Sequence, residues 1–129
     1  MLYLAAAVSD FYVPFGAMAE HKMQSAAGVP TITLTNSPKM LQPLRHEWIP
    51  EAFMVSFKLE TDTSILVKKA QASIAKYGMN LVIANLLQTR KEEVHFITAE
   101  ASTTIHRGDA VDIEEEMIKA LKAEHDKFK

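Results

Sequence analysis

The chain has 129 residues, of which 48% are hydrophobic and 23% are charged, and its formal net charge is −2. This length and composition predict a single domain over residues 1–129, and so small a charge favours no nucleic-acid partner. The absence of cysteine excludes disulfides, thiolate metal sites and a cysteine nucleophile. We find neither a secretory leader nor an apolar run of about 18 residues, so we expect a cytoplasmic protein with no membrane segment.

The first segment, Leu2–Val8, is apolar except for one tyrosine hydroxyl, and it predicts a buried strand of a parallel sheet. Ligands bind beyond the carboxyl ends of such strands. The small side chains of Ala6 and Ala7 would let a flat ring lie against the backbone there. Asp10 can accept a hydrogen bond from a ligand or cap a turn, and Lys22 can meet a phosphate or carboxylate or be a solvated surface residue.

The next part of the chain, residues 12–29, contains a proline and two glycines and predicts a long loop with one helical turn near Met18–Met23. Pro30–Thr35 then alternates apolar residues with threonines, which is typical of a half-exposed strand. A short helix is predicted after a cap at residue 36 or 37, and two prolines end it near Trp48.

A strand, a helix and a second strand are predicted next. Ala52–Phe57 is apolar enough for a buried strand, and an amphipathic helix capped by Thr61 or Asp62 runs from there to about Tyr77, where a glycine stops it. Leu81–Ala84 predicts the next buried strand. This succession indicates a right-handed crossover unit in a mostly parallel sheet.

Polar or aromatic residues follow these strands at the edge where a ligand would lie. Phe57 is either a core residue or a stacking platform for a base, and the residue pattern alone favours the core. Asn85 is either a turn residue or a ligand contact. Arg90 and Lys91 lie in a polar turn and can meet a triphosphate, although a solvated turn explains them equally well.

The last part of the chain predicts an antiparallel hairpin and a helix. Val94–Ala99 and Ser102–Ile105 form the hairpin, and we expect no metal site from its histidines, which no acidic residue accompanies at fixed spacing. The helix runs from a cap at Asp112 to about Lys127, with acids in its first turn and lysines in its last. Its predicted inward residues are Ile113, Met117, Ile118 and Leu121.

Five stretches, taken in order, identify a family. LAAAVSDFYVP, EHKMQS, SPKMLQPL, AFMVSFKLETD and ANLLQTRKEEVHFIT together resemble eukaryotic phosphopantothenoylcysteine synthetase, the phosphopantothenate–cysteine ligase, from Leu2 to about Lys122. The resemblance implies an α/β fold with a mostly parallel sheet, flanking helices and an antiparallel hairpin. Nothing in the chain matches the glycine-rich N-terminal half of the family, because its four glycines are scattered singly. We therefore expect a partial Rossmann-like fold that corresponds to the C-terminal portion of the synthetase.

The resemblance implies a ligase of coenzyme A synthesis. In this reaction 4′-phosphopantothenate attacks the α-phosphate of ATP or CTP, in the presence of Mg²⁺, and cysteine then displaces the nucleotide to form an amide. The implied roles are Lys22 as the catalytic cation, Ala6, Ala7, Asp10 and Phe57 as nucleotide contacts, and Asn85 as the phosphopantothenate contact. For Phe57 the resemblance favours the stacking role over the core.

Family members dimerise through this portion, so we expect a homodimer or pairing with a full-length subunit. Two alternatives to a working ligase remain open. The chain could be a nucleotide-binding module that does not turn over, or a structural protein that only pairs with synthetase subunits. Its first strand would also leave an apolar edge that favours association with other chains.

Overall fold

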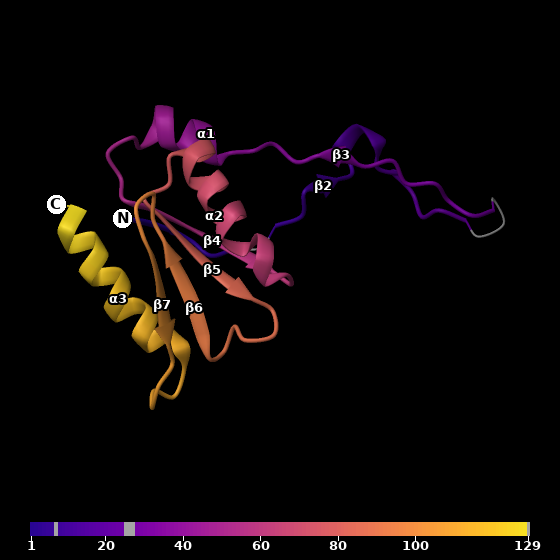
Figure 1. Ribbon diagram of the computed structural model, residues 1–129. Coiled ribbons are helices and arrows are strands. Elements are labelled where there is room, and N and C mark those ends of the chain that lie inside the picture. The colour runs from indigo at the N-terminus through magenta and orange to yellow at the C-terminus, as the bar shows by residue number, and fades with distance from the viewer. Residues whose placement is uncertain (7, 25–27, 129) are drawn as a thin grey trace. The chain divides into compact units, whose positions relative to one another are not determined.

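The computed structural model describes residues 1–6, 8–24 and 28–128 (Figure 1). These residues form two compact units. The main unit contains residues 1–6 and 40–128, and the second unit contains residues 8–24 and 28–39.

The main unit is built on a five-stranded sheet with the strand order β1-β4-β5-β6-β7. The first three strands are parallel, and β6 and β7 form an antiparallel hairpin next to β5. The strand bounds are Leu2–Leu4 for β1, Met54–Glu60 for β4, Leu81–Leu86 for β5, Glu93–Ile97 for β6 and Ser102–His106 for β7. The predicted mostly parallel α/β fold with a hairpin is therefore confirmed.

Two long helices flank this sheet (Figure 1). Helix α2 covers Thr63–Tyr77, and it begins where the Asp62 carboxylate accepts a hydrogen bond from the Ser64 amide at 2.8 Å. It ends at Gly78, whose φ of 67° lies in the left-handed region that favours glycine. Helix α3 covers Ile113–Phe128. Of the two predicted caps, Thr61 and Asp62, the structure uses Asp62, and the predicted stop at residue 78 is confirmed.

The period-two alternation of the strands creates two separate cores, one on each face of the sheet. On one face Val55 and Ile83 pack against Met117 and Leu121 of α3. On the other face the next residues along the strands pack against α2, and they are joined by residues of a short helical segment. That segment consists of one turn of α1, Leu41–Pro43, and a π-helical turn η3, Leu44–Trp48.

The second unit has little packing of its own. Strand β2, Phe11–Tyr12, pairs antiparallel with β3, Thr35–Asn36, and a single 3-10 turn η1 covers Phe15–Ala17. None of its described residues, 8–24 and 28–39, is buried. Several large apolar side chains are exposed instead, among them Phe15 and Val29 at 89% and 96%.

Four predictions of local structure differ from the observed elements. The strand predicted over Leu2–Val8 ends at Leu4, and among the described residues it pairs with β4 alone, so it forms the apolar edge that the sequence also predicts. The strand predicted over Pro30–Thr35 is reduced to β3, since only its end meets β2. The helical turn expected near Met18–Met23 lies earlier, at η1, and the helix expected from residue 37 begins at Leu41.

One further difference concerns α3. Ile118 is 54% exposed, whereas the other three predicted inward residues, Ile113, Met117 and Leu121, are buried. A single helix face packs on the sheet, and residue 118 is rotated away from that face. Among the helices of the described residues, none combines the length and the apolar character needed to cross a membrane.

Candidate functional site

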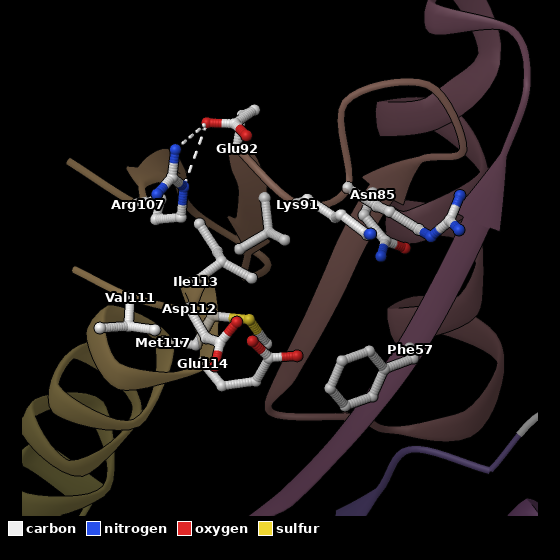
Figure 2. Close-up of a pocket in the computed structure, with 12 residues that line it drawn as sticks. Phe57, Asn85, Lys91, Glu92, Arg107, Val111, Asp112, Ile113, Glu114 and Met117 are labelled. Carbon is white, nitrogen blue, oxygen red and sulfur yellow. Dashed lines mark hydrogen bonds and ion pairs between the residues drawn. The ribbon is translucent and has the colours of Figure 1, made fainter. Parts of the chain in front are cut away.

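A cavity of about 400 Å³ lies in the main unit where the parallel strands end (Figure 2). Its walls come from the middle of β4, the end of β5, the turn before β6, the segment after β7 and the first turn of α3. Phe57 does not end its strand as the sequence predicts, because β4 continues to Glu60. The lining residues are Phe57, Asn85, Arg90, Lys91, Glu92, Val94, Arg107, Val111, Asp112, Ile113, Glu114 and Met117. Open α/β sheets bind ligands at this position, beyond the carboxyl ends of their strands.

Strand alternation explains why the aromatic and amide side chains share this cavity. Phe57 is two residues from Val55, and Asn85 is two residues from Ile83, so both point to the face that α3 covers. Phe57 is half-buried against that core, and the Tyr3 ring of β1 contacts it edge-on, with ring centroids 5.1 Å apart. One face of the sheet thus presents an aromatic ring, fixed by its neighbour, beside an amide.

Three cations line the cavity, and they differ in how they are held. Arg107 is fixed by two bonds to one Glu92 oxygen, 3.2 Å from Nε and 2.9 Å from Nη2, and its charge is therefore compensated. Arg90 donates only to the Leu87 carbonyl, at 2.7 Å, and Lys91 has no hydrogen-bond or ion-pair partner within the described residues. The charges of Arg90 and Lys91 are therefore available to an anionic ligand.

A carboxylate lies at the aromatic side of the cavity. Glu114, in the first turn of α3, extends toward Phe57, whereas Lys91 and Asn85 lie on the other side (Figure 2). This charge acts on the Tyr3 hydroxyl. Burial raises the pKa of Tyr3 above its usual value, and the negative charge of Glu114 raises it further. Cationic and anionic groups thus face a ligand from different directions.

The cavity brings together three of the predicted site residues, Phe57, Asn85 and Arg90. Ala6 is exposed and follows the end of β1 by two residues, and Ala7 lies outside the described residues. Asp10 and Lys22 belong to the second unit and are not among the residues that line the cavity.

In the second unit Asp10 forms an exposed ion pair with Lys39. Its backbone carbonyl also accepts from the Ser37 amide at 2.8 Å, which joins the residue before β2 to the residue after β3. Lys22 is exposed, and its carbonyl accepts from the Gln24 side chain at 3.3 Å.

Sequence reasoning missed several residues of the site. Arg107 follows a predicted strand and Glu114 sits in a predicted helix turn, where acids ordinarily serve the helix dipole. Tyr3 lies within the apolar run Leu2–Val8, where nothing in the sequence marks it as a site residue. The alternation of residues 3, 57 and 85 on neighbouring strands was the available signal, but it requires the strand order, which the sequence does not state.

Comparisons with known proteins agree with this fold. The family model described as DNA/pantothenate metabolism flavoprotein C-terminal domain matches residues 1–125. Phosphopantothenate–cysteine ligase 1 of Oryza sativa subsp. japonica is 51% identical over 129 residues, which cover 99% of this chain and 40% of that protein. The phosphopantothenate–cysteine ligase of Homo sapiens is 42% identical over 133 residues, with 99% and 43% covered.

A solved structure of a Cab2 mutant in complex with phosphopantothenate-cysteine superposes with a TM-score of 0.85 at 38% identity. The match covers 95% of this chain and 42% of that one. The chain therefore spans less than half of the length of these relatives. The resemblance to phosphopantothenate–cysteine ligases is confirmed, and the chain belongs to the family of the DNA/pantothenate metabolism flavoprotein C-terminal domain.

Proposed function

We propose that this chain acts in a ligase of coenzyme A biosynthesis that joins 4′-phosphopantothenate to cysteine through an acyl-nucleotide intermediate. The observation that carries the proposal is the cavity in which Phe57, Asn85 and the uncompensated Arg90 and Lys91 converge at the carboxyl edge of the sheet. An aromatic platform beside two cations suits a nucleoside triphosphate, because the ring can stack on a base while the cations meet phosphates.

The reaction has two balanced steps. The phosphopantothenate carboxylate attacks the α-phosphorus of ATP or CTP, a new P–O bond forms, and the bond to the β-phosphate breaks to release pyrophosphate. The cysteine amine then attacks the acyl carbon, loses a proton and displaces the nucleoside monophosphate. Both steps move negative charge onto phosphate oxygens, so fixed cations at those oxygens lower the barrier.

The roles of Phe57, Arg90 and Asn85 follow from their charge and their position in the cavity: Phe57 stacks with the base, Arg90 binds the triphosphate and Asn85 holds the phosphopantothenate part. The family resemblance supplies the other roles, with Lys22 as our proposed cation for the reacting phosphate and Asp10, Ala6 and Ala7 as nucleotide contacts. Mg²⁺ would be supplied with the triphosphate, because it is commonly bound by substrate phosphates and water.

Pyrophosphate release tests this function directly. The purified chain is given phosphopantothenate and Mg²⁺ with ATP or CTP, with and without cysteine, and a Lys22→Ala variant is measured beside it. A working ligase releases pyrophosphate continuously only with cysteine, and the variant loses most of this activity, since one good charge donor contributes about 3–4 kcal/mol to a barrier. Continuous pyrophosphate release at the same rate with and without cysteine would contradict the proposed reaction.

A non-catalytic role within the same family is the second candidate. The chain spans about 40% of a typical relative, and the second unit exposes apolar side chains such as Phe15, Val29 and Ile32. Such an exposed apolar surface is typical of a protein interface. We propose that this unit pairs with a second copy or with a full-length subunit. Triphosphate binding and a dimeric mass without pyrophosphate release would favour this candidate.

A further inference from the structure

The proposed ligase reaction assigns no role to the carboxylate of Glu114. It lines the cavity proposed for a polyanionic nucleotide, where a negative charge opposes binding unless a donor group of the ligand faces it. Within the described residues Glu114 has no hydrogen-bond or ion-pair partner, whereas Glu116, two residues on, pairs with Lys119. An unpaired carboxylate inside this cavity therefore indicates that a hydrogen-bond donor of the ligand faces it.

Its surroundings indicate which part of the ligand it meets. Figure 2 shows the side chain of Glu114 extending toward Phe57. Tyr3 supports the same proximity. Its ring centroid lies 5.1 Å from that of Phe57, and its pKa is raised by burial and by the charge of Glu114. Lys91 and Asn85 lie on the other side of the cavity (Figure 2). The carboxylate thus belongs to the aromatic end of the site and not to the cationic end.

We propose that Glu114 is a specificity residue that accepts a hydrogen bond from the exocyclic amino group of a base stacked on Phe57. The inference rests on the proposed nucleotide function of this cavity. A carboxylate is an acceptor only, so it favours bases with an amino group at that edge, adenine or cytosine, and repels the carbonyl of hypoxanthine or uracil. The cavity would then match a nucleotide at both ends: carboxylate to amino group, and cations to phosphates.

Matched pairs of nucleotides isolate this contact. Dissociation constants are measured for ATP against inosine triphosphate and for CTP against uridine triphosphate, with the complete chain and Mg²⁺. The members of each pair differ in the exocyclic group, which is an amino group in adenine and cytosine and a carbonyl in hypoxanthine and uracil, and in the adjacent ring nitrogen, which carries a proton only in the carbonyl base. A charge-assisted hydrogen bond predicts at least about a tenfold preference for the amino base in both pairs.

Two variants separate base recognition from general charge effects. Glu114→Gln keeps the size of the side chain and offers both a donor and an acceptor, so the preference should fall to less than about threefold. Glu115→Gln removes the same charge from the same helix turn but does not line the cavity. It should leave the preference intact, although either change can raise the affinity for all four triphosphates alike.

The outcomes distinguish a failure of the role of Glu114 from a failure of the nucleotide site. Equal affinities within the pairs in the unsubstituted chain, or a preference that survives Glu114→Gln, would overturn the role of Glu114 while leaving the nucleotide site in place. If Glu114→Gln and Glu115→Gln reduce the preference for amino bases equally, the role of Glu114 is likewise overturned. If no triphosphate binds at all, the proposed function fails, and base recognition by Glu114 fails with it.

Discussion

Truncation of Phe57 separates the two roles that the sequence left open for this residue, core and stacking platform. The Phe57→Ala variant removes the ring that faces the cavity. Stacking of a base on an aromatic side chain contributes about 1–3 kcal/mol, so the dissociation constant for a triphosphate should rise by roughly 5- to 150-fold. Isothermal titration with ATP and CTP at a temperature well below unfolding measures this change.

The structure also sets the expected loss of stability. Phe57 is only half-buried, although it packs against the α3-side core and against Tyr3. Its truncation should therefore cost less than the roughly 3–5 kcal/mol of a fully buried phenylalanine. Phe57→Leu serves as the control, because it keeps apolar packing but presents no ring face, and it should lose binding while retaining most of the stability. A folded Phe57→Ala protein whose triphosphate affinity changes less than twofold would refute the stacking role.

Two further predictions concern α2 and the tyrosine of β1. Gly78→Ala should lower the free energy of unfolding by about 1–2 kcal/mol, because Gly78 has a φ of 67°, and chemical denaturation that shows no loss would contradict this reading of the helix end. Tyr3 should ionise at a higher pH than an exposed tyrosine, and Glu114→Gln should lower its pKa, as followed by NMR of labelled tyrosine rings. Since the folded state holds this proton more tightly than an unfolded chain with a pKa near 10.0, stability should fall as the pH rises above that value, and less so in the variant.

Local sequence signals predicted the elements that depend on near neighbours in the chain. The cap at Asp62, one of the two capping residues predicted, and the stop at Gly78 are both encoded within about one helix length. The same holds for the hairpin of β6 and β7, whose strands are joined by a short turn. These features need no knowledge of the rest of the fold.

Strand pairing was the main source of error. The alternating pattern of Pro30–Thr35 is suited to a strand, yet only Thr35–Asn36 finds a partner, in Phe11–Tyr12. Leu2–Val8 is apolar enough for a longer strand, but β4 pairs with three of its residues. A strand exists only where another backbone supplies hydrogen bonds, and that partner lies far away in the sequence.

Residue types and periodicity were enough to predict the α/β class and the long helices, whereas the family and the ligand roles of Phe57 and Asn85 came from the resemblance of five stretches to a known family. The folded chain shows in addition that Phe57, Asn85 and Arg90 share one cavity, that Glu114 lines it and that Tyr3 packs edge-on against Phe57. These arrangements depend on strand order and on which face α3 covers. They bring together residues from separate strands and helices, which no local pattern can register.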